Sequence, residues 1–113
     1  MELLEMYEKV SLQVPMEQRR FFNYFDDAVN ELRGLYPVDK LIFINGKEYT
    51  PPKKLTDEMV VRPLWHDPIL DNILWKATQN EIYKSEFLRK SREVYKGYNK
   101  NETKGRVIKR ARW

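Results

Sequence analysis

The sequence contains no cysteine and only one histidine among its 113 residues. Without cysteine the chain has neither a disulfide framework nor a thiolate metal site, and a single histidine cannot build an imidazole cluster. A chain that needs no disulfide suits a cytoplasmic setting or the interior of a virion. We therefore expect a hydrophobic core to hold the fold, without metal or other cofactor.

Long apolar runs are also missing from the sequence. No stretch approaches the roughly 18–20 apolar residues that a helix needs to cross a bilayer. The N-terminus, MELLEMYEKV, mixes acidic with apolar residues and lacks the basic start of a secretory signal. We expect a soluble protein that makes no membrane contact.

Residues that could carry catalysis are few and scattered. His66 and Asp67 are neighbours, but no other ligand-type residue lies at a helical spacing from them, so we interpret Asp67 as a helix N-cap preceded by a half-exposed imidazole. The acidic pairs at 26–27 and 57–58 are adjacent in sequence, and adjacent side chains on a helix diverge by about 100°. Four glycines form no phosphate-binding loop. The sequence predicts a protein that is not an enzyme.

Aromatic residues, by contrast, are abundant: seven Tyr, five Phe and three Trp within a 42% apolar fraction. This is enough apolar area for one core, and a chain of this length normally forms one domain. The Phe residues at 21, 22 and 25 have a helical spacing, which indicates core rather than a platform for stacking bases.

Positive charge is concentrated at the C-terminus. The net charge of the chain is +4, but residues 99–113 carry six Lys or Arg and one Glu, a net charge of +5. Residues 1–98 therefore have a net charge of −1. The C-terminal segment therefore carries the excess positive charge of the chain, whatever that charge binds.

Apolar spacing predicts four helices, over about 2–14, 16–35, 67–77 and 83–98, with breaks at Pro15, Pro37 and residues 79–81. Between the second and third helices, residues 41–50 place Asn45-Gly46 between two strand-like segments, which predicts a β-hairpin with a type I′ turn. A lone hairpin is marginally stable, so it needs cover from a helix or another subunit. The fold class is thus mainly α: a small four-helix domain, residues 1–98, with an inserted β-hairpin.

Residues 99–113 are predicted to form an extended basic tail. The ending RVIKRARW interrupts its basic residues with Val107, Ile108 and Trp113, which a purely solvating tail would not need. An extended segment of this kind can dock on a partner as an added strand. A frayed, solvated terminus is the alternative.

Several segments together resemble the head-tail connector, or adaptor, proteins of long-tailed phages and prophages. They are RRFFNYFDDAVNELRGLYP, a variable hairpin or loop, WHDPILDNILWKAT, YKSEFLRKSREVYKGY and the basic tail. The resemblance spans nearly the whole chain but includes no invariant catalytic signature. It implies a non-enzymatic ring that docks beneath the capsid portal in the virion neck, after assembly in the host cytoplasm. It also implies that DNA passes through the channel without sequence-specific binding.

The resemblance further implies two contact regions. The tail would dock on the portal, and the hairpin would contact the adjacent subunit of the ring; a downstream head-completion or tail protein would bind below. The portal-docking residues would be Arg106, Val107, Ile108, Lys109, Arg110, Arg112 and Trp113, and the inter-subunit residues Phe43, Asn45, Gly46, Lys47 and Tyr49.

Two alternatives are open at this stage. The fourth helix and the tail would neutralise phosphates in a small helical nucleic-acid-binding regulator, although the −1 charge of residues 1–98 speaks against it. The second alternative is another phage structural or chaperone-like protein with the same helical core.

Overall fold

The computed structural model describes the backbone of residues 1–110 and the side chains of residues 1–98. The described chain is mainly helical, as predicted, and contains no strand. Its elements are α1 (Leu3–Gln13), α2 (Gln18–Leu35), α3 (Asp39–Ile42), the 3₁₀ turn η1 (Pro63–Trp65), α4 (His66–Thr78) and α5 (Glu81–Arg110).

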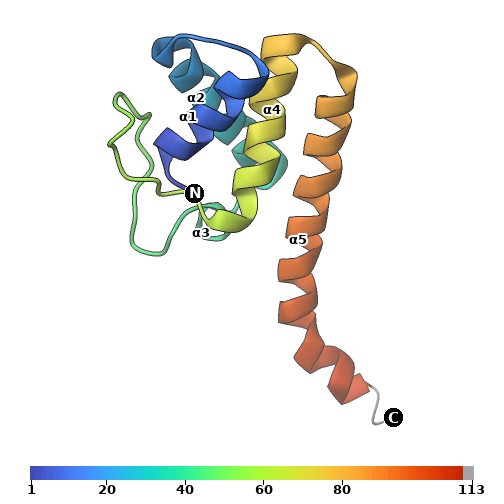
Figure 1. The fold of residues 1–113 in the computed structure, drawn as a ribbon. Helices are drawn as coiled ribbons and strands as arrows, with labels where there is room; N and C mark the ends of the chain where they lie inside the picture. Colours follow the sequence, from blue (N-terminus) through green and yellow to red (C-terminus); the bar gives the residue numbers. More distant parts are fainter. Residues whose placement is uncertain (111–113) are drawn as a thin grey trace.

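Helix α4 is the centre of the core. It packs against α1, α2 and α5, and Figure 1 shows α1 on one side of it and α5 on the other. Its Ile69 and Ile73 are fully buried, together with Trp65 just before it. The aromatic stripe predicted for α2 faces this core, since Phe21 and Phe25 are buried.

The break between α4 and α5 lies where the sequence predicts it. Gln79 has a φ of 60°, in the left-handed region, and its N–H donates to the carbonyl of Trp75 at 2.7 Å. The side chain of Asn80 then accepts the N–H of Ile82 at 3.0 Å, which satisfies a free donor in the first turn of α5.

The predicted N-cap of α4 is wrong. The helix begins at His66 rather than after Asp67, and no side chain caps it. The preceding 3₁₀ turn runs directly into α4, so the N-H of His66 donates to the carbonyl of Pro63. Asp67 lies within the first turn, as does Pro68.

The predicted β-hairpin at 41–50 is also wrong. Residues 39–42 form the short helix α3, and Phe43 pairs with Val61 in an isolated antiparallel bridge. Asn45-Gly46 does form a turn, because the N–H of Lys47 donates to the carbonyl of Ile44 at 3.0 Å. Only Gly46 has a positive φ, of 79°, so the turn is not type I′, which requires positive φ at both residues.

The end of α3 is stabilised by residues far away in sequence. The Nε of Arg62 donates to the carbonyl of Lys40 at 3.1 Å, and the Nε1 of Trp65 donates to that of Leu41 at 2.7 Å. The backbone N–H of Arg62 donates to the carbonyl of Ile42 at 2.8 Å. These donors satisfy carbonyls that a helix end otherwise leaves free.

Helix α5 continues past the predicted start of the tail. Its backbone is helical through Arg110, so the prediction of an extended tail is wrong for residues 99–110, while 111–113 lie outside the described residues. Tyr95 stacks on Tyr36 with ring centroids 4.7 Å apart, and Tyr98 stacks on Trp65 at 6.4 Å. Beyond these contacts α5 runs away from the rest of the molecule (Figure 1).

Candidate functional site

A long loop, residues 45–59, connects α3 to η1 and lies beside Phe25 of α2. Its two ends are joined by a bond from the N–H of Ile44 to the carbonyl of Val60, 2.8 Å long, beside the Phe43–Val61 bridge. Within the loop, the N–H groups of Lys53 and Lys54 both donate to the carboxylate of Asp57. These two bonds lower the pKa of Asp57.

Two of the five residues predicted for inter-subunit contact are engaged within the chain. Phe43 is buried and stacks on Tyr49, with ring centroids 5.2 Å apart. The hydroxyl of Tyr49 donates to Asp26 of α2 at 2.7 Å; burial, followed by this bond, raises the pKa of Tyr49. The guanidinium of Arg33 lies over the Phe43 ring, 5.3 Å from its centroid.

The other three residues of this set are exposed. Asn45, Gly46 and Lys47 form the turn, and Lys47 reaches Glu58 across the loop with a nitrogen–oxygen distance of 3.1 Å. The structure thus divides the predicted contact set into a pair that fixes the loop on α2 and three residues open to solvent.

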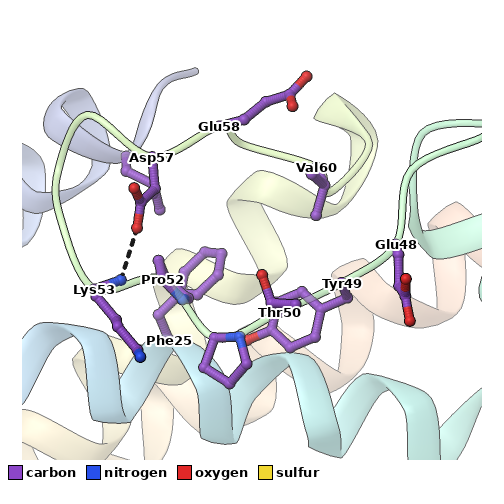
Figure 2. A pocket seen from close by; sticks show the side chains of 11 residues that line it. Phe25, Glu48, Tyr49, Thr50, Pro52, Lys53, Asp57, Glu58 and Val60 are labelled. Carbon is purple, nitrogen blue, oxygen red and sulfur yellow. Dashed lines mark hydrogen bonds between the residues drawn. The ribbon is translucent and has the colours of Figure 1, made fainter.

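A pocket of about 550 Å³ opens beside this loop (Figure 2). Phe25 of α2 and the loop residues Tyr49, Thr50 and Pro52 line it, with Pro52 beside Lys53 on the left of this view and Tyr49 on the right. The carboxylate of Glu58 points away from it, and that of Asp57 toward the backbone of Lys53. The polar residues of its lining, among them Glu48, Thr50 and Lys53, are exposed.

A second concavity, which the sequence did not reveal, is almost entirely apolar. It has a volume of about 370 Å³ and lies between α2 and α5, with α4 at its base. Lys84 extends across Trp75, its Nζ 4.9 Å from the ring centroid. The lining residues are Glu31, Gly34, Leu35, Trp75, Lys84, Phe87 and Leu88. We call this concavity the apolar groove. The only sequence sign of it was Trp75, which flanks the predicted core stripe of its helix.

The predicted docking tail falls at the end of α5. The backbone of residues 106–110 is helical, while their side chains, and Arg112 and Trp113 altogether, lie outside the described residues. The tail and the turn at 45–47 are therefore separate features, one at the tip of α5 and one on the loop.

His66 is buried rather than half-exposed. Only 4% of its surface is accessible, and its Nε2 lies 2.8 Å from the carbonyl of Val61. Because a carbonyl only accepts, Nε2 carries the proton of this bond. Burial lowers the pKa of His66 and outweighs the opposing effect of the bond. The ring thus joins α4 to the end of the loop.

Among the side chains of residues 1–98, no three His, Asp or Glu residues come together in a group that could hold a metal ion. None of the helices in the described part of the chain combines the length and apolar character needed to cross a bilayer. The arrangement offers surfaces for binding. No protein-family model, curated protein or solved structure matches the chain.

Proposed function

We propose that the protein is a non-enzymatic virion structural protein, a ring-forming adaptor between the capsid portal and the tail or the next head-completion protein. The proposal builds on the sequence resemblance to head-tail connectors. One structural observation supports it above others: α5 carries the basic segment beyond the packed body, where a partner can reach it (Figure 1).

Charge distribution supports a protein partner with an acidic surface. The segment from residue 99 onward has a net charge of +5, while residues 1–98 have a net charge of −1. Complementary charge speeds encounter and fixes orientation, and exposed pairs weaken as salt rises, because the Debye length is about 10 Å at 0.1 M ionic strength. The apolar residues of the tail would contribute a salt-resistant part.

The test is binding of the full chain to an isolated portal ring of a long-tailed phage, followed by particle mass in solution. Neutralising Lys109, Arg110 and Arg112 to Gln should weaken binding, most clearly at low salt. A matched control neutralises three exposed lysines of the body, Lys40, Lys53 and Lys54, and should bind as the unchanged chain does.

Equal binding by the tail variant and the body control would contradict the proposal. The nucleic-acid alternative is measured in parallel, with a labelled DNA duplex in place of the portal. If the tail variant lost DNA binding while the unchanged chain showed no affinity for the portal, a nucleic-acid-binding protein would replace the adaptor.

A further inference from the structure

The apolar groove has no partner within the described chain. Helices α2 and α5 both lie beside α4, and the space between them is left open. Leu35 and Leu88, on its two edges, are 49% and 39% exposed. Exposed apolar side chains that gather at a concave site are a mark of an interaction surface.

Gly34 keeps one wall of the groove open. A Cβ at this position would meet no other atom within 4 Å, so a side chain there would enter free space rather than the core. The φ of Gly34 is not positive, and it lies inside α2, where glycine is a poor helix former. The backbone therefore does not require glycine here, and the open wall is its main structural consequence.

Helix α1 presents the second unpartnered face. Leu12 is 85% exposed and Leu4 44% exposed, although the opposite side of the same helix is buried in the core. Leu4, Glu8 and Leu12 are four residues apart, so they form one ridge about 12 Å long. A ridge of this spacing fits the furrow between two helices.

The two faces are complementary in charge. Glu5 and Glu8 lie on the exposed side of α1, and neither pairs with a basic residue among the described side chains. In the groove, Glu31 is already paired with Lys76, at 3.1 Å, whereas no carboxylate among the described side chains pairs with Lys84. The groove therefore offers the cation Lys84 to a ridge whose one charged member is Glu8.

A chain cannot bring its own ridge into its own groove. Figure 1 shows α1 and α5 on opposite sides of α4, and α1 is fixed there by Leu3, Met6 and Val10 in the core. An α1 ridge that fills the groove must therefore come from a second copy of the chain.

We propose that the apolar groove binds α1 of a second copy of this chain, with the Leu4–Glu8–Leu12 ridge between α2 and α5 and Glu8 next to Lys84. The contact joins two different faces, so it leaves a free groove at one end and a free ridge at the other. Such head-to-tail contacts give a closed ring when the rotation between copies closes. The inference rests on the ring of the proposed function and names the surfaces that would form it.

The lack of native cysteine permits a direct test by disulfide cross-linking. Leu12→Cys and Leu88→Cys are made in separate full-length chains and mixed under mild oxidation. Cross-linked pairs should form in the mixture and far less in either variant alone. Ile82→Cys serves as the matched control in place of Leu88→Cys, because Ile82 is exposed on α5 but does not line the groove. Equal cross-linking with both partners, or pairing of Leu12→Cys only with itself, would overturn the proposal.

Association in solution gives the second test. Gly34→Trp should fill the groove and weaken self-association, measured by sedimentation, about tenfold or more, whereas Gly34→Ala should leave it unchanged. Both variants should keep the thermal unfolding of a folded chain, since the space at Gly34 is open. Glu8→Lys should weaken association, and Lys84→Glu in the partner should restore it. An unchanged mass for Gly34→Trp and Glu8→Lys would refute the inference.

The cross-linking and sedimentation measurements are made on the protein alone, without a portal. Cross-linking that persists in a chain that fails to bind the portal would refute the proposed adaptor and leave the head-to-tail contact standing. Portal binding by chains without the Leu12–Leu88 cross-link would refute the contact alone.

Discussion

Four polar side chains are buried among the described residues, and three of them lie on α4: His66, Asp71 and Asn72. Each has a partner on another segment. Asn72 donates to Glu31 of α2, Asp71 pairs with Lys90 of α5 and His66 bonds to Val61. Because a buried polar group without a partner is costly, these contacts fix how the neighbouring segments sit on α4.

We predict that His66 makes the protein less stable as pH falls below about 6.5, its ordinary pKa. The pKa of His66 is lowered in the folded protein by burial, so the unfolded chain takes up the proton first and unfolding is favoured. The loss is complete once pH is below the folded-state value. Urea unfolding between pH 8 and 5.5 should show this dependence in the unchanged chain and less of it in His66→Gln, which retains a donor for Val61. Parallel curves for the two proteins would contradict it.

Replacing one partner of the Asp71–Lys90 pair should destabilise the protein more than replacing both. Burial raises the pKa of Asp71 even though Lys90 lies 2.7 Å away and opposes the effect. Lys90→Met should leave a buried carboxylate without its counter-charge and lower the free energy of unfolding by about 1–3 kcal/mol. Adding Asp71→Asn to this variant should recover part of the loss. Urea unfolding of the four proteins of the cycle measures this, and a double variant at least as unstable as Lys90→Met would disprove it.

Among the elements, the loop at 45–59 depends on one unusual backbone position. Gly46 has a φ of 79°, where a side chain costs about 1–2 kcal/mol, while Asn45 has no positive φ. Gly46→Val should therefore lower the free energy of unfolding by about that amount. Asn45→Val should change it by less than about 0.5 kcal/mol. Equal losses in both variants, measured by urea unfolding, would favour a type I′ turn instead.

The sequence predicted the helices whose apolar residues repeat regularly and whose ends carry strong signals. Pro15 and the break at 79–81 are local, so α1, α2, α4 and the start of α5 could be placed. Residues 41–50 could not, because the donors that stabilise the end of α3 come from Arg62 and Trp65, about twenty residues later. Local strand preference was outweighed by these distant bonds and by the burial of Ile42.

The candidate surfaces were harder to predict than the helices. The apolar groove combines residues of α2, α4 and α5. The periodicity of apolar residues within one helix does not reveal a space that three helices enclose. For the C-terminal segment, charge alone does not distinguish strand from helix, and residues 99–110 continue α5 even though the segment contains Gly105, a residue that often ends helices. The position of the turn at Asn45-Gly46 was predicted correctly, but its type was not.

At the scale of the whole molecule, the packed body ends where the aromatic contacts of α5 end. Deleting residues 104–113 should therefore change the midpoint of thermal unfolding very little. Ending the chain after Val94 should lower it markedly, because this removes Tyr95 from Tyr36 and Tyr98 from Trp65. Thermal unfolding followed by circular dichroism compares the two. If the shorter deletion unfolds the protein, the C-terminal segment belongs to the core.

The antiparallel bridge at Phe43 and Val61, closed by the bonds from Ile44 to Val60 and from Arg62 to Ile42, bears on the continuity of the chain. The chain segments before and after the loop meet at this bridge. Helix α4, which follows the loop, packs against α1 and α2, which precede it. Hydrolysis of one peptide bond near the exposed Lys53–Lys54 pair would thus leave two fragments, each holding half of a shared core. Besides the contacts that the loop makes, its continuity raises the effective concentration of one half for the other, and that benefit falls only slowly with loop length. The fold should accordingly accept insertions in the loop, and a nicked molecule should persist as a non-covalent complex of its two fragments.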